Sequence, residues 1–207
     1  MIDVFNAELI LKFVEILGLI TGVIYVIGAI LEKKWCWYFG IIAVISYAIS
    51  TYFYKLYGEF VLQFFYLAIS FYGLLQWNTK NTAIPLKEKT LINELRIEFS
   101  SIKSISTYIF IGAVLSYFIY LGLVYFKSSY PFWDAITSSF GIIATYLTVK
   151  KKIDNWILWI IIDAILSVVL YLKEMPFYSF LYLIYLIFAY IGFLKWKSEI
   201  EKYKLKI

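Results

Sequence analysis

Seven runs of about 20 predominantly apolar residues divide this chain of 207 residues, and they constrain its fold more than any other feature. A helix rises about 1.5 Å per residue and the hydrocarbon core of a bilayer is about 30 Å thick, so a run of this length can cross it. The runs are approximately 9–30, 35–54, 58–77, 105–126, 131–149, 155–172 and 176–196. The pattern predicts an all-α membrane protein with seven transmembrane helices.

The composition argues against a water-soluble domain and against most kinds of active site. The chain is 63% hydrophobic and only 16% charged, whereas soluble domains are about 45–50% apolar and about 25% charged. It has no histidine and Cys36 is its only cysteine, which removes most metal sites, histidine-dependent catalysis and any intrachain disulfide. Glycine-rich nucleotide-binding loops are missing too. We therefore expect no enzyme, no cofactor and no metal.

The basic residues are distributed unequally over the two faces that seven spans define. Fifteen of the 19 lysines and arginines fall on the face that holds the C-terminus, and four fall on the other. Because basic loops stay in the cytoplasm, this asymmetry predicts an external N-terminus and a cytoplasmic C-terminus in the plasma membrane. The net charge of +5 is then explained by orientation and by contact with anionic lipid, and not by nucleic-acid binding.

The sequence also repeats itself at an offset of 119 residues. Residues 17–77 align with 136–196 without a gap, and 13 of the 61 pairs are identical. The uncommon residues that match are Gly22 with Gly141, Lys33 with Lys152, Trp37 with Trp156, Tyr66 with Tyr185, Gly73 with Gly192, and Trp77 with Trp196. With one span between them, two three-span repeats enter the membrane from the same side. This 3+1+3 arrangement of parallel repeats is typical of transporters, and a duplicated scaffold without a substrate pathway is the alternative.

These features divide the chain into five segments. They are a first three-helix repeat (1–77), a cytoplasmic linker (78–104), a connecting helix (105–126), a second three-helix repeat (127–197) and a basic cytoplasmic tail (198–207). Within the linker, apolar residues from Leu91 to Ile102 follow Pro85 at helical spacing. We expect an interfacial helix there, with a docking surface for a cytosolic partner as the alternative.

Asp163 is the strongest candidate for a substrate-binding residue. It lies near the middle of the sixth predicted span, where a charged side chain costs about 2.5–3.5 kcal/mol. Trp156 and Trp159 precede it at helical spacing and share its face. Indole faces and a carboxylate together favour an organic cation. The alternative is an Asp163 that is protonated, or hydrogen-bonded to a neighbouring helix, and serves only packing.

Polar and aromatic residues of the third and seventh spans complete the predicted site. Gln63 and Tyr66 share one face of the third span, and a buried glutamine can both donate and accept hydrogen bonds. Their repeat mates in the seventh span are Tyr182 and Tyr185. For these four residues the alternative is hydrogen bonding and packing between helices.

Tryptophans at the ends of the predicted spans indicate an aromatic belt, because indoles favour the headgroup region. The tryptophans expected there are Trp35, Trp77, Trp133 and Trp196. Trp37 also lies at a span end, but its repeat mate is Trp156. We therefore keep Trp37 as a candidate binding residue.

The order and spacing of these residues resemble the PnuC-type nicotinamide riboside transporter family of bacteria. The resemblance covers about residues 10–197 and is most specific in the runs YGEFVLQFFYLAISFYGLLQW and NWILWIIIDAILS. It implies a fold similar to an enlarged SWEET sugar transporter, assembly as a homotrimer in the bacterial inner membrane, and facilitated diffusion. It also implies that a cytosolic kinase drives uptake by phosphorylating the substrate. The pocket residues that it carries over are Gln63, Trp156, Trp159 and Asp163.

The family implies a vitamin as the substrate, and the residues favour a flat cation. Nicotinamide riboside carries a pyridinium, and thiamine, which relatives transport, carries a thiazolium. Riboflavin is neutral and fits less well beside Asp163. We expect nicotinamide riboside, with thiamine as the alternative. A sodium- or proton-coupled carrier and a non-transporting membrane scaffold are further alternatives.

Overall fold

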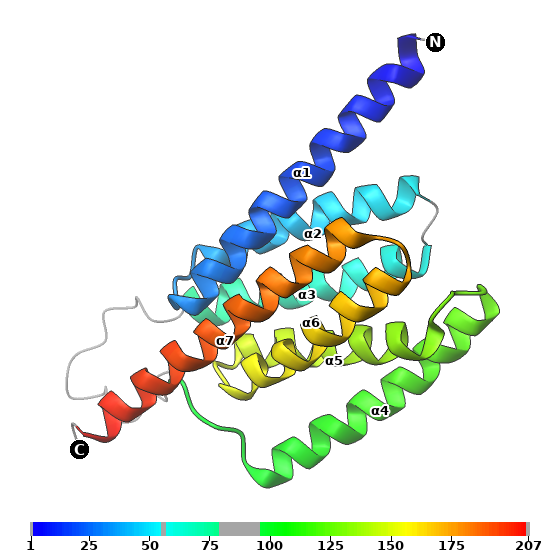
Figure 1. Ribbon diagram of the computed structural model, residues 1–207. Coiled ribbons are helices and arrows are strands. Elements are labelled where there is room, and N and C mark those ends of the chain that lie inside the picture. Colours follow the sequence, from blue (N-terminus) through cyan, green and yellow to red (C-terminus); the bar gives the residue numbers. More distant parts are fainter. Residues whose placement is uncertain (1, 55–56, 79–95, 206–207) are drawn as a thin grey trace. The chain divides into compact units, whose positions relative to one another are not determined.

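Seven α-helices form the protein in the computed structural model, which describes residues 2–54, 57–78 and 96–205. The helices are α1 (Ile2–Ile30), α2 (Cys36–Phe53), α3 (Tyr57–Asn78), α4 (Ile102–Tyr125), α5 (Pro131–Val149), α6 (Asp154–Leu172) and α7 (Pro176–Lys204) (Figure 1). Each helix includes most of one predicted run, but α1 begins earlier, at Ile2, and α7 continues to Lys204, into the predicted tail. The seven helices confirm the all-α prediction. The chain divides into two units, Met1–Leu74 and Leu75–Ile207.

Six of the helices are long and apolar enough to cross a bilayer, and α5 is the one that does not meet this criterion. More than half of its 19 residues are buried, and it packs against both α4 and α6. Its hydroxyl groups bond within the helix, as in the 2.8 Å bond from Thr145 Oγ1 to Gly141 O. A helix enclosed by other helices needs less apolar surface than one that faces lipid, so burial explains the polar sequence of α5.

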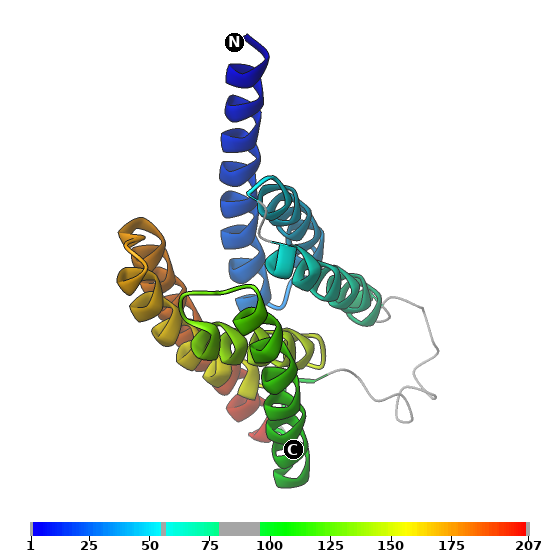
Figure 2. The same ribbon diagram turned by 90° about the vertical axis from the view of Figure 1, so that its right-hand side faces the viewer.

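In the first unit, α1 and α2 pack as an antiparallel pair. Figures 1 and 2 both show the N-terminal half of α1 extending beyond α2. Apolar side chains of this part, among them Ile10, Phe13 and Ile16, are exposed. Lipid chains are the solvent that suits such a surface.

In the second unit, α4 to α7 pack in chain order, each against the next. Contact is most extensive between α6 and α7, which lie side by side in Figure 1. Helix α4 touches its neighbour closely at Gly112, where a Cβ would lie 2.6 Å from the ring of Phe140. Because Gly112 is the buried residue of α4, this helix presents most of its apolar side chains outward.

Four helices end in a left-handed cap that contains no glycine. The cap residues are Glu32, Lys127, Lys151 and Glu174, with φ between 52° and 59°. The next amide in each case bonds to a carbonyl five residues back, as Lys152 N–H does to Leu147 O at 2.9 Å. Glycine usually occupies this position in a Schellman motif. The sequence therefore has no glycine that would mark where α1, α4, α5 and α6 end.

The turn after α1 and the turn after α5 make the same backbone hydrogen bonds, 119 residues apart. Lys33 N–H donates to Gly28 O at 2.9 Å, and Lys152 N–H donates to Leu147 O at 2.9 Å. The bonds that begin α2 and α6 correspond in the same way. Helices α1 and α5 also end at equivalent positions. The two turns therefore share one backbone geometry.

The predicted interfacial helix between Leu91 and Ile102 lies for the most part outside the described residues. Of its last part, residues 96–101 are not helical, and α4 begins at Ile102. The helical pattern therefore does not extend through Phe99. The reason is that Glu98 pairs with the backbone of the turn between α5 and α6.

Two of the four tryptophans expected in the headgroup belt are buried instead. Trp77 is buried and its Nε1 donates to Val149 O at 3.0 Å. Trp196 is fully buried, with its ring edge-on to Trp156 at 5.4 Å between centroids. The belt prediction is wrong for these two because their rings find partners inside the protein. Trp35 and Trp133 are exposed, as the prediction requires.

Candidate functional site

The second unit buries a carboxylate near the middle of α6. Asp163 is 4% exposed. Its carboxylate makes no hydrogen bond and no ion pair with any residue that the structure describes. A charge buried in this way costs several kcal/mol unless a partner of opposite charge reaches it. This burial suits either a carboxylate that binds a cation or a protonated carboxyl that serves packing, the two interpretations given for Asp163.

The face of α6 predicted to carry the site is present. Asp163 and Ser167 are buried on it together with Trp156, and Trp159 is half-buried. Trp156 packs against α7, because a Cβ at Gly192 would lie 2.7 Å from its ring. The indole Nε1 of Trp156 is buried and has no hydrogen-bond partner among the described residues. In this structure Trp156 joins α6 to α7, and Trp159 is the more accessible indole.

Helix α7 brings two tyrosines to the neighbourhood of this face. The rings of Tyr182 and Tyr185 lie edge to face, 5.8 Å apart, and both side chains are half-buried. The hydroxyl of Tyr185 lies within electrostatic range of Asp163. A hydrogen bond of 2.7 Å from Ser179 Oγ to Ser167 O holds the two helices together. The structure therefore brings Asp163 and Tyr185 together, as the repeat predicted.

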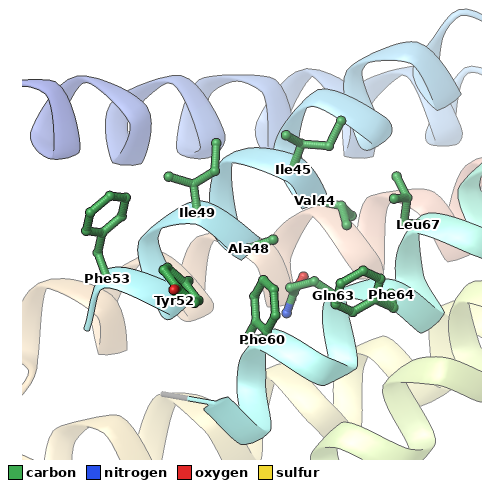
Figure 3. A pocket seen from close by; sticks show the side chains of 10 residues that line it. All are labelled: Val44, Ile45, Ala48, Ile49, Tyr52, Phe53, Phe60, Gln63, Phe64 and Leu67. Carbon is green, nitrogen blue, oxygen red and sulfur yellow. The ribbon is translucent and has the colours of Figure 1, made fainter. Parts of the chain in front are cut away.

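The first unit contains a groove of about 370 Å³ between α2 and α3. Figure 3 shows the ten side chains that line it. They are Val44, Ile45, Ala48, Ile49, Tyr52, Phe53, Phe60, Gln63, Phe64 and Leu67. Gln63 supplies the one amide of this lining and Tyr52 the one hydroxyl, so the groove is otherwise apolar.

Gln63 is 6% exposed at this groove. Its Nε2 donates to Glu59 O, one turn earlier in α3, at 3.1 Å. Its amide oxygen accepts no hydrogen bond from any described residue. Gln63 therefore offers an acceptor in an apolar setting, where a hydrogen bond is stronger than in water.

The other two candidates of the first unit lie outside the groove lining. Tyr66 is half-buried and lies within electrostatic range of Tyr25. Trp37 is fully buried, with its ring 5.5 Å from that of Tyr25. A Cβ at Gly73 would lie 2.5 Å from the Trp37 ring. Trp37 therefore packs α2 against α3.

Groove residues of the first unit have polar repeat mates in the second. The pairs are Val44 with Asp163, Ala48 with Ser167, Phe60 with Ser179, and Gln63 with Tyr182. An apolar lining in one repeat thus corresponds to a carboxylate and hydroxyl groups in the other.

Sequence reasoning missed the ionic contacts at the ends of the helices. Lys173 Nζ lies 2.8 Å from Asp134 Oδ1, and Ser128 Oγ donates to the same carboxylate. Lys152 pairs with Glu98 in the second unit. From the sequence, the basic residues were explained by membrane orientation and by contact with anionic lipid, and neither of these pairs was predicted. Opposite charges at the ends of neighbouring spans are the signal that could have indicated these pairs.

The candidate side chains of each unit suit binding better than catalysis. The second unit offers a carboxylate, hydroxyl groups and aromatic faces, and the first unit offers an amide beside an apolar groove. Among the described residues searched, no group of three or more histidine, cysteine or acidic side chains could hold a metal ion.

Comparison with known proteins identifies the family. Residues 12–198 match the family described as nicotinamide mononucleotide transporter. The nicotinamide riboside transporter PnuC of Escherichia coli (strain K12) is 26% identical over 204 residues, covering 90% of this chain and 85% of that protein. PnuC of Neisseria mucosa is 25% identical, covering 97% of this chain and 76% of that protein.

A solved structure, the crystal structure of the vitamin B3 transporter PnuC, has the same fold. Its TM-score is 0.71 at 23% identity, and the match covers 97% of this chain and 86% of that one. The family match extends over nearly the whole sequence and agrees with the resemblance seen in the residues. This chain therefore belongs to the nicotinamide mononucleotide transporter family, a family of membrane transporters and not of enzymes.

Proposed function

We propose that this protein carries nicotinamide riboside across the bacterial inner membrane by facilitated diffusion. The observation that carries the proposal is the buried carboxylate of Asp163, which has no partner among the described residues. The pyridinium of nicotinamide riboside supplies the positive charge that this carboxylate lacks. Relatives named as nicotinamide riboside transporters support the same substrate.

In the second unit, Asp163 attracts the pyridinium and Trp159 offers it an aromatic face. Tyr185 and Tyr182 add hydroxyl groups to the same region. Trp156 shapes the site through its packing on Gly192. These roles need a cation, so a neutral vitamin such as riboflavin binds more weakly.

In the first unit, the amide oxygen of Gln63 accepts a hydrogen bond from the carboxamide or a ribose hydroxyl of the substrate. Tyr66 lies one turn farther along the same helix and can contribute a hydroxyl. Trp37 supports this face by packing on Gly73.

We infer that the fold arose by duplication, as a 3+1+3 arrangement of parallel repeats similar to SWEET proteins. Support comes from the two turns of equal geometry and from the contact of Trp37 with Gly73, which Trp156 and Gly192 repeat. We further propose that α5 is the seventh span. The basic residues then place the N-terminus outside and the C-terminus in the cytoplasm.

The resemblance carries two further proposals, assembly as a homotrimer and a functional link to a cytosolic kinase. A facilitator alone only equalises the substrate concentration across the membrane. Phosphorylation in the cytoplasm removes the transported species and gives net uptake.

Uptake by proteoliposomes tests the proposed function. Vesicles with the purified protein take up radiolabelled nicotinamide riboside saturably, and an enclosed riboside kinase with ATP raises accumulation above the external concentration. Collapse of sodium and proton gradients leaves the initial rate unchanged. Thiamine and riboflavin run in parallel as alternative substrates.

Asp163→Asn tests the role of the carboxylate, with Glu199→Gln as the matched control. Glu199 is the acidic residue of a surface ion pair with Lys202, so its neutralisation leaves uptake intact. Asp163→Asn lowers uptake at least tenfold in a protein that remains folded. If thiamine is the only vitamin that is taken up saturably, thiamine is the substrate. If no vitamin is taken up, the result favours a non-transporting scaffold.

A further inference from the structure

The turn between α5 and α6, residues 149–154, anchors the C-terminal end of α3. Trp77 Nε1 donates to Val149 O at 3.0 Å. The ammonium of Lys151 lies over the Trp77 ring, 4.9 Å from its centroid, and Lys151 is 5% exposed. A desolvated cation over an indole face is a favourable contact. The end of α3 is therefore fixed to this turn.

The same turn anchors the segment that precedes α4. Glu98 N–H donates to Lys151 O at 3.2 Å, and Ile153 N–H donates to Glu98 O at 3.0 Å. The Glu98 carboxylate pairs with Lys152. Ser100 N–H donates to Asp154 Oδ2 at 2.6 Å. Four contacts, two of them charge-assisted, thus hold residues 98–100 against the start of α6.

Both anchors meet at Lys151, through its side chain for Trp77 and through its carbonyl for Glu98. Trp77 and Glu98 therefore both contact a single turn. Asp154, which binds Ser100, is the first residue of α6.

We propose that this turn is a hub that sets the position of α6, and that Glu98, Lys151 and Asp154 are positioning residues for Asp163. Asp163 lies nine residues beyond Asp154 on one continuous helix, a rise of about 13.5 Å. Its carboxylate has no hydrogen bond to a described residue. The placement of α6 therefore determines where the carboxylate lies. This proposal rests on the proposed function, because its transport measurement uses nicotinamide riboside as the substrate.

Neutral variants of the hub test this proposal in proteoliposomes. Glu98→Gln and Asp154→Asn each raise the KM for nicotinamide riboside about five- to tenfold and leave Vmax within about twofold. Glu199→Gln, the matched change in a surface ion pair, leaves both unchanged. The charge-reversed pair Glu98→Lys with Lys152→Glu recovers most of the KM lost by Glu98→Lys alone.

Hydrogen exchange measures the hub itself. The amide of Ser100 exchanges faster in Asp154→Asn, because a neutral amide oxygen accepts its hydrogen bond more weakly than the carboxylate. The amides of Glu98 and Ile153 exchange faster in Glu98→Gln, because loss of the ion pair with Lys152 lets their backbone hydrogen bonds open more often. Faster exchange with an unchanged KM overturns the proposal, since the hub then only stabilises the fold. Unchanged exchange and unchanged KM overturn it as well.

A second readout is independent of the substrate. In a Cys36→Ser background, Asp163→Cys is labelled by a small methanethiosulfonate reagent, and the labelling rate reports the surroundings of position 163. Adding Asp154→Asn changes this rate at least threefold, whereas Glu199→Gln does not. A changed rate in a protein whose wild type takes up no vitamin supports the hub and contradicts the proposed function. An unchanged rate overturns the hub.

Discussion

The pair α2–α3 and the pair α6–α7 occupy equivalent places in the two proposed repeats but have different interiors. Each pair is closed at one end by an indole on a glycine, Trp37 on Gly73 and Trp156 on Gly192. Beyond this contact, α2 and α3 leave an apolar groove with Gln63, whereas α6 and α7 stay close along their length. The same tryptophan–glycine contact therefore occurs in one helix pair that leaves a groove and in one that is closely packed.

The difference follows from small and large side chains at equivalent positions. Ser179 is small enough for its hydroxyl to reach Ser167 O across the α6–α7 interface. Its mate in the first repeat is Phe60, a ring that lines the groove beside Ala48. The two proposed repeats thus share their contacts at the helix ends, whereas the middle of each helix pair has a different chemistry.

Exchange of the mates Val44 and Asp163 has the largest expected effect. Asp163→Val removes the carboxylate, so uptake falls to background while the melting temperature rises. Val44→Asp places a carboxylate in the apolar groove and costs about 2.5–3.5 kcal/mol. Uptake assays and fluorescence-detected melting of the two variants measure these changes.

Val44→Leu is the control for the first repeat, since it keeps the groove apolar. If uptake persists in Asp163→Val, transport does not need the carboxylate of Asp163, and the prediction is contradicted. The double variant, with the two residues exchanged, is expected to remain inactive.

The next largest effect concerns the indole–glycine contacts. A Cβ at residue 73 would lie 2.5 Å from the Trp37 ring, and one at residue 192 would lie 2.7 Å from Trp156. Gly73→Ala and Gly192→Ala therefore each destabilise the protein by about 1–3 kcal/mol through overpacking. Thermal melts in detergent check the prediction.

Gly122→Ala is the matched control, because nothing lies within 4 Å of the Cβ that it adds. It leaves the melting temperature unchanged or slightly raised, as expected for alanine in a helix. If only one of Gly73→Ala and Gly192→Ala lowers the melting temperature strongly, the two tryptophan–glycine contacts are not equally tightly packed.

A smaller effect is expected for the hydrogen bond that holds α6 to α7. Ser179→Ala removes the 2.7 Å bond to Ser167 O and costs about 0.6 kcal/mol, the mean for such bonds between membrane helices. Ser106→Ala is the control, since the exposed Ser106 hydroxyl bonds only to Ile102 O of its own helix. Equal melting temperatures for the two variants refute a role of Ser179 in the close packing.

An effect of similar size separates an ordinary helix cap from the hub. Lys127 and Lys151 both have left-handed backbones, with φ of 56° and 52°. Lys127 is exposed, so Lys127→Gly stabilises the protein by about 0.5–1 kcal/mol. Lys151→Gly also loses the ammonium over Trp77 and gains nothing. If the melting temperature rises for both variants, the contact between Lys151 and Trp77 does not stabilise the protein measurably.

Much of the fold could be predicted because each span is a local property of the sequence. Runs of apolar residues fixed the seven helices, and the offset of 119 residues paired Trp37 with Trp156 and Gly73 with Gly192. The site could be predicted in part. The burial of Asp163 follows from its place in an apolar run. The position of Tyr185 near Asp163 was predicted from the repeat, in which Tyr185 is the mate of Tyr66.

The remaining features depend on contacts between segments that lie far apart in sequence. Trp77 and Trp196 have the position and type of belt residues, but their rings are buried by other helices. The non-helical conformation of residues 96–101 requires the turn that they pair with, so helical spacing alone was misleading. The groove beside Gln63 depends on how far α2 and α3 stand apart.

The sequence by itself determined that this chain forms apolar helices of membrane length, that 13 residues recur at one offset of 119, and that one carboxylate lies in an apolar span. These are consequences of hydropathy, spacing and identity along the chain. Only the tertiary structure decided which indoles pack on glycines, and that Glu98 and Trp77 meet at Lys151. Such contacts arise from the packing of whole helices, whose side-chain fit no local pattern specifies.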